Sequence, residues 1–100
     1  MKEIVILSGA EADLIELYAR FEEMGAGMGD RFDAECRRSY ERLSQYPEIA
    51  AVYRSPFRRR ILKRWNVGLF YTIEANRVLI HAALDIRQDP DNIMRRLGFL

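Results

Sequence analysis

The spacing of apolar and polar residues divides the chain into a helical half and a strand-rich half. Lys2 to Leu7 is a β-branched run that is too short for a helix, so it predicts a strand. Further along, apolar residues recur three and four positions apart, which predicts two amphipathic helices. Their inward-facing residues are Ala10, Leu14, Leu17, Tyr18 and Phe21 in the first helix, and Met28, Phe32, Cys36, Tyr40 and Leu43 in the second.

Local signals predict where these two helices begin and end. Ser8 stands where an N-cap is expected, and Glu11 follows three residues later, as in a capping box. Glycines 25 and 27 predict the end of the first helix, because glycine adopts the left-handed conformation past a helix terminus. Pro47 limits the second helix. Two helices with so short a link are expected to form an antiparallel hairpin.

The second half of the chain predicts an antiparallel meander and a last short helix. The expected strands are Ile49 to Tyr53, Phe57 to Trp65, Val67 to Ile73 and Arg77 to Arg87, separated by short breaks. The Asp89-Pro90-Asp91 sequence begins a final helix, in which Ile93, Met94 and Leu97 are available to pack. We therefore expect one α+β domain over residues 1 to 100, a small antiparallel sheet with an N-terminal strand and a helical hairpin packed on one face.

Strand alternation assigns residues of the last strand to two faces of the sheet. Val78, Ile80, Ala82, Leu84 and Ile86 form a continuous apolar face, which we assign to the core. The opposite face of the sheet is then expected to expose several bases together with Gly68, Thr72, His81, Asp85 and Arg87.

Composition places the chain among soluble globular domains. It is 49% hydrophobic and 31% charged, and no apolar run approaches the roughly 20 residues that span a bilayer. The acidic start does not resemble a signal peptide, so a cytoplasmic protein is expected. Cys36 and His81 are the only residues of their kinds, so no metal site and no cofactor are expected. Cys36 is interpreted as a core residue of the second helix.

Charge is distributed unevenly along the chain. Six of the 16 Lys and Arg residues lie between Arg54 and Arg64, and no Asp or Glu occurs from Ile49 to Ile73. Residues 1 to 48 carry a net charge of −5, and residues 49 to 100 carry +6. Such asymmetry indicates an anion-binding surface, two halves that cover each other, or a solvated basic edge that the acids balance.

Two features near the end of the last expected strand suggest chemistry. His81 and Asp85 lie four residues apart on a strand, about 13 Å, which is too far for a catalytic dyad. Arg87 is expected near the basic strand, where converging guanidinium groups would hold a phosphate or a carboxylate. The alternative for Arg87 is an ion pair with Asp89 or Asp91.

Several short motifs follow one another in the second half of the chain: Arg58-Arg59, Leu62-Lys63-Arg64, Trp65-Asn66-Val67, Phe70-Tyr71 and the stretch from Ala83 to Pro90. Their order resembles the RelE/ParE family of bacterial toxins, and in particular its ParE-like branch. The resemblance covers essentially the whole chain, because the strand, the helical hairpin and its Leu-x-x-Tyr-Pro end at Leu43 to Pro47 match as well.

This resemblance implies a cytoplasmic toxin of a type II toxin–antitoxin pair, neutralised by a ParD-like or similar antitoxin. ParE-like members block DNA gyrase, whereas RelE-like members cleave mRNA on the ribosome. The binding residues for target or antitoxin are then expected to come from the following set: Arg58, Arg59, Arg60, Lys63, Arg64, Trp65, His81, Asp85 and Arg87.

Departures from both branches bear on the activity. RNA-cleaving relatives carry an arginine where this chain has Gly68, and a tyrosine or histidine near the final helix, where this chain has Ile93. Arg87 is the one residue at a recurrent catalytic position, with Arg59 or Lys63 near another.

The ParE-like pattern is also altered, since Asp85 replaces its usual histidine and Gln88 its second arginine. Gyrase inhibition without catalysis is the leading hypothesis. The alternatives are an mRNA endoribonuclease that uses Arg87, and a non-toxic nucleic-acid-binding module.

Overall fold

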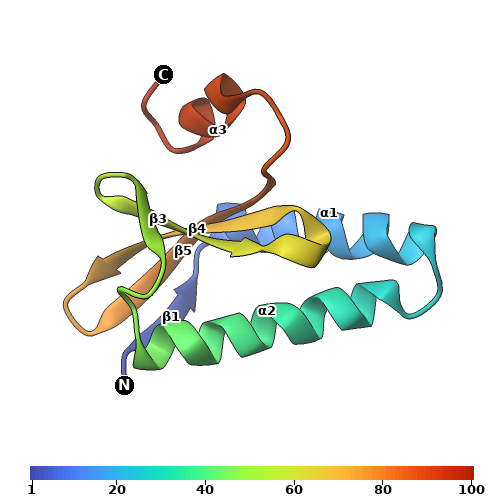
Figure 1. Ribbon diagram of the computed structural model, residues 1–100, viewed down its shortest axis with the longest axis horizontal. Helices are drawn as coiled ribbons and strands as arrows, with labels where there is room; N and C mark the ends of the chain where they lie inside the picture. The colour runs from blue at the N-terminus through green and yellow to red at the C-terminus, as the bar shows by residue number, and fades with distance from the viewer.

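The computed structural model describes all residues from Met1 to Leu100 (Figure 1). Five strands form one mixed sheet in the order β1-β5-β4-β3-β2. The strands are β1 (Glu3–Ile6), β2 (Ala51–Arg54), β3 (Phe57–Leu62), β4 (Val67–Glu74) and β5 (Arg77–Asp85). The helices are α1 (Ser8–Met24), α2 (Met28–Gln45) and α3 (Pro90–Arg96), with a short 3-10 turn, η1 (Lys63–Trp65). No helix is long and apolar enough to cross a membrane.

The two long helices form the predicted hairpin and lie side by side (Figure 1). Gly27 has φ +84°, the left-handed conformation that allows the chain to turn directly into α2. The predicted capping box is wrong, because α1 already includes Ser8 and its N-cap is Leu7, with no side-chain cap hydrogen bond. Leu7 has an extended backbone and donates its N–H to the carbonyl oxygen of Ile80 in β5, so it takes the N-cap position. The helix therefore begins at Ser8, one residue earlier than predicted.

The meander from β2 to β5 is antiparallel, as predicted, and β1 joins its far edge parallel to β5. The third strand ends at Leu62 rather than at Trp65. Lys63 to Trp65 instead form η1, followed by Asn66 in the left-handed conformation at φ +54°. This turn directs the Trp65 ring into the core, where only 5% of the residue is exposed.

A β-bulge at His81 reverses the alternation of β5. Tyr71 pairs with Ile80 but Phe70 pairs with Ala82, so His81 is an extra residue on β5. The prediction of one continuous apolar face from Val78 to Ile86 is therefore wrong. Val78 and Ile80 face the helical hairpin, whereas Ala82 and Leu84 face α3.

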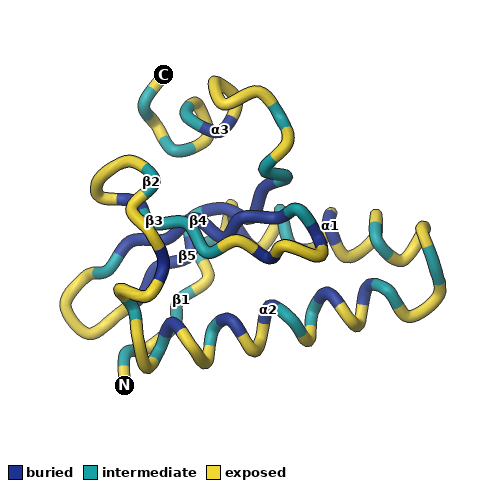
Figure 2. Tube along the Cα trace, in the orientation of Figure 1, coloured by how far each residue is buried: buried dark blue, intermediate teal, exposed yellow.

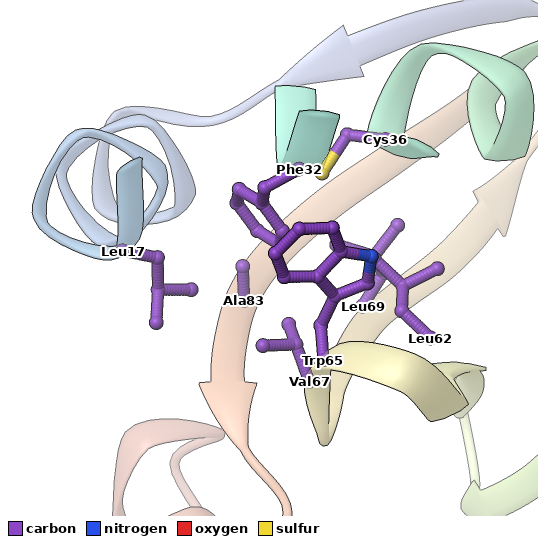
Figure 3. Packing of buried hydrophobic residues seen from close by; sticks show 8 residues of the cluster. All are labelled: Leu17, Phe32, Cys36, Leu62, Trp65, Val67, Leu69 and Ala83. Carbon is purple, nitrogen blue, oxygen red and sulfur yellow. The ribbon is translucent and has the colours of Figure 1, made fainter. Parts of the chain in front are cut away.

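The main core fills the space between the sheet and the helical hairpin (Figure 3). Phe21, Phe32 and Trp65 make edge or tilted contacts there, with ring centroids 4.8 to 5.5 Å apart. Cys36 lies in this core, as predicted, and burial raises the pKa of its thiol to about 12. Tyr18 was expected to face inward as well, but it lies on the outer side of α1 and is 37% exposed.

A second, smaller core lies on the opposite face of the sheet, under α3. Phe70, Ala82 and Leu84 pack there against Ile93. Helix α3 lies on the side of the sheet opposite to α2 (Figures 1 and 2), so the expectation of an open sheet face is wrong. The helix begins as predicted, since Asp89 accepts a hydrogen bond from the Asp91 backbone and Pro90 stands in the first turn. After α3, the Phe99 ring packs on the same side of the sheet and contacts the Phe57 ring, whereas Leu100 is exposed.

Candidate functional site

The six basic residues between Arg54 and Arg64 gather at one end of the sheet, on β2, β3 and η1. This basic cluster comprises Arg54, Arg58, Arg59, Arg60, Lys63 and Arg64. The molecule contains six ion pairs with N to O distances of 4.0 Å or less, and none of them involves a member of this cluster. The positive charge of the basic cluster is thus uncompensated within the fold.

Strand alternation divides the basic cluster between the two faces of β3. Arg58 pairs in register with Tyr71, whose ring lies in the core on the hairpin side. Arg59 pairs with Phe70, which lies under α3. The expectation that the bases collect on one non-core face is therefore wrong. The basic cluster surrounds the β2–β3 edge of the sheet from both sides.

Several arginine side chains of the basic cluster are anchored by contacts within the fold. Arg58 donates hydrogen bonds to the carbonyl oxygens of Ala50 at 2.8 Å and Glu48 at 3.3 Å. The Arg59 guanidinium lies 4.9 Å from the centre of the Tyr53 ring. Nε of Arg60 is buried without a hydrogen-bond partner. The contacts of Arg58 and Arg59 fix these two side chains while leaving their charges without a carboxylate partner, so less conformational entropy is lost when an anionic partner binds.

The 3-10 turn presents two further bases to solvent. Lys63 and Arg64 are both exposed, and the Arg64 guanidinium lies 5.7 Å from the centre of the Trp65 ring. Trp65, the last residue of this turn, is buried in the main core. Of the aromatic residues that a nucleic-acid-binding sheet would need on its surface, neither Trp65 nor Phe70 is exposed.

Arg87 is paired with Asp85, rather than with Asp89 or Asp91 as the alternative interpretation held. Nε and Nη2 of Arg87 lie 3.1 and 2.9 Å from the two carboxylate oxygens of Asp85, and the Arg87 backbone N–H also donates to Asp85 at 2.8 Å. This fork holds the pKa of Asp85 below its usual range. The carboxylate offsets the charge of Arg87, which leaves Arg87 less available for a phosphate.

His81 lies among residues of the α3 side of the sheet and has no carboxylate partner. Its Nε2 and the Thr72 hydroxyl are 2.8 Å apart, and its ring meets the edge of the Phe57 ring at 5.0 Å between centroids. Burial lowers the pKa of His81, which favours the neutral imidazole at pH 7. His81 and Asp85 have separate partners, in agreement with the expectation that they form no catalytic dyad.

A polar cleft beside Asp85 was not anticipated from the sequence. It has a volume of about 210 Å³ and lies between α1, the end of β5 and α3. Asp13 and Arg96 form an ion pair in this cleft although 83 residues separate them. No sequence pattern signals this contact, because it depends on where β1 ends. The lining residues are Asp13, Glu16, Leu17, Arg20, Ala83, Leu84, Asp85, Gln88 and Arg96.

The sequence and the fold were compared with those of known proteins. No known family model matches the sequence, and no curated protein matches it. Among solved structures, the chain is similar to one from the "Chromosomal ParDE TA system from P. aeruginosa", with a TM-score of 0.71 and 17% sequence identity. The likeness covers 83% of this chain and 94% of that chain. At this identity the match establishes the fold alone, and it confirms the expected RelE/ParE-like architecture.

Proposed function

We propose that this chain is the toxin of a type II toxin–antitoxin pair. The observation that carries the proposal is the likeness to the ParDE structure, which extends over 94% of that chain. The motifs from Arg58 to Pro90 support it, because they follow the order of the ParE-like branch. A fold alone does not determine function, so the target has to be argued from individual positions.

We infer that the target is DNA gyrase in the cytoplasm and that the chain acts without catalysis. At position 68, where RNA-cleaving relatives carry an arginine, a Cβ on Gly68 would lie 2.9 Å from Cγ2 of Ile86. Ile93 of α3, where they carry a tyrosine or histidine, is buried against the sheet. Arg87 is engaged by Asp85. Three positions at which RNA cleavage would require polar groups are thus filled or neutralised, which favours gyrase over mRNA.

We propose further that the basic cluster is the surface that an antitoxin covers. Its six charges have no carboxylate partner in the fold, so an acidic segment would gain ion pairs without displacing existing ones. Since the cluster surrounds an edge of the sheet, such a segment would contact both faces of β3. If the same residues touch gyrase, the antitoxin neutralises by occupying them.

Pulse labelling of cells that express this chain alone tests the proposed target. Thymidine and methionine incorporation would be followed side by side after induction. We expect DNA synthesis to fall first while translation persists. A collapse of methionine incorporation within minutes would instead indicate RNA cleavage. If neither falls, the chain is not a toxin.

A further inference from the structure

Helix α1 carries a second apolar face that points away from the core. Ala10 and Leu17 are buried against the sheet, whereas Ile15 is 66% exposed. Tyr18 lies four residues after Leu14 and three after Ile15, so the three side chains line one stretch of α1, where Leu14 also packs against the main core. With Glu11 and with Asp33 of α2 they line a groove of about 230 Å³. An exposed isoleucine in a groove between two helices is apolar surface that the fold itself does not cover.

Tyr18 forms a fixed wall of this groove. Its hydroxyl donates a hydrogen bond of 2.5 Å to Oδ1 of Asp30. Its ring lies so close to α2 that a Cβ on Gly29 would be 2.9 Å from two ring atoms. Glycine at position 29 therefore allows the ring to approach α2 closely. A tyrosine that is already immobilised loses little entropy when a partner packs on it, which is a property of strong binding residues.

The charges around the groove are acidic. Glu11 and Asp33 are the charged residues of its lining, and Arg37, which pairs with Asp33 at 2.9 Å, lies outside it. Glu11 forms no ion pair. Helix α1 as a whole has five acids and one base, a net charge of −4. Asp30, Glu22 and Asp33 all raise the pKa of Tyr18. A partner with acidic flanks would be repelled here, and a basic one would be attracted.

We propose that this groove binds a basic amphipathic helix of a partner protein. Two apolar side chains of that helix, three or four residues apart, would cover Ile15 and pack on Tyr18. Lysine or arginine residues beside them would meet Glu11 and Asp33. From Glu11 to Tyr18 the groove extends over about 10 Å of helix, so it accommodates about two turns of a partner. The surface is distinct from the basic cluster in position and in sign, and the inference does not depend on the proposed toxin function.

A selection from displayed helical peptides tests this inference on the intact chain. A random library of 16-residue helix-forming peptides is selected on the full-length protein. The matched variants are Ile15→Arg in the groove and Ile61→Arg, which places the same charge at another exposed isoleucine on β3. Both positions are exposed, so both variants are expected to keep the thermal stability of the parent, which is checked first.

We expect the enriched peptides to carry a net positive charge and apolar residues at helical spacing. Their affinity should fall by about tenfold or more on Ile15→Arg and on Glu11→Lys, and remain unchanged on Ile61→Arg. Amide shifts in NMR spectra of the complex should map to Leu14, Ile15 and Tyr18. Three outcomes would overturn the inference: no enrichment, enrichment of acidic sequences, or equal binding to Ile15→Arg and the parent.

Discussion

Arg96 of α3 donates two parallel hydrogen bonds of 2.9 Å to the carboxylate of Asp13 in α1, Nη1 to Oδ1 and Nη2 to Oδ2. Oδ2 of the same carboxylate also accepts the Ala83 N–H of β5 at 3.0 Å. Strand β1 ends at Ile6, and Asp13 takes the place of a strand partner at that edge of β5. One side chain thus joins helix α1, the sheet and helix α3.

Replacement of Asp13 by alanine should lower the free energy of unfolding by about 2 kcal/mol, because it leaves the Ala83 N–H without an acceptor. Arg96→Met should cost only about 0.5 to 1 kcal/mol, since the Arg96 side chain is 41% exposed and that of Asp13 only 12%. Urea denaturation of both variants measures the difference. Equal losses in the two variants would mean that the bond to Ala83 contributes nothing.

Gly68→Ala should destabilise the protein by about 1 to 3 kcal/mol through overpacking. The new Cβ would lie 2.9 Å from Cγ2 of Ile86 and 3.1 Å from the Phe70 ring. Gly9→Ala in α1 is the control, since its nearest neighbours are 3.7 Å away and alanine favours the helix. Thermal denaturation should show a loss for position 68 and none for position 9. Tolerance of alanine at both positions would contradict the close packing around position 68.

Because of His81, the free energy of unfolding should rise with pH. Burial lowers the pKa of the folded-state imidazole below its unfolded value of about 6.5. The unfolded chain therefore binds the proton more readily. The contribution of His81 to stability is complete above that unfolded value and is lost as the pH falls through the folded pKa. Guanidinium denaturation between pH 5 and pH 8 should show stability rising with pH, and His81→Gln should flatten that rise.

The NMR titration of His81 checks the same point directly. The chain has one histidine, so its C–H proton resonances are unambiguous. We expect a midpoint below about pH 6.5. A midpoint above that value would contradict the burial of His81 between Thr72 and Phe57, and the slope of stability with pH would then have the opposite sign.

Charge reversal in the basic cluster should weaken antitoxin binding. The triple variant Arg59→Glu, Arg60→Glu, Lys63→Glu should bind the co-expressed antitoxin at least about tenfold less tightly, and its affinity should depend less on salt. The control is Arg31→Glu, Arg37→Glu, Arg38→Glu on α2, which has the same change in net charge. Titration calorimetry at two salt concentrations compares them. If the two triple variants lose affinity equally, net charge alone explains the effect.

Local signals predicted the helices and strands of this fold well. Long-range contacts determine which face of the sheet each residue occupies. Gly27 and the Asp89-Pro90 start of α3 act within a few residues, so the sequence shows them directly. The bulge at His81 has no such signal, because it depends on how β5 pairs with β4. That one residue moved Ala82 and Leu84 to the face covered by α3.

The candidate site was predicted in composition but not in arrangement. The run of bases was visible as an acid-free stretch, and its lack of ion pairs agrees with a binding role. The basic cluster is divided between the two faces of β3 because side chains alternate along the strand, and Arg59 lies opposite the buried Phe70. Predicting this division would have required knowing that α3 covers that face of the sheet. The partner of Arg87 was mistaken, because the turn after β5 brings the Arg87 backbone N–H and guanidinium back to Asp85.

The central claim is that this chain inhibits DNA gyrase rather than cleaving RNA. The most direct measurement is gyrase-catalysed supercoiling of relaxed plasmid DNA in the presence of the purified chain, with a purified translation system run in parallel. We predict that supercoiling is inhibited at stoichiometric concentrations of the chain while translation continues and the mRNA stays intact. Unaffected supercoiling together with cleaved mRNA would contradict the account.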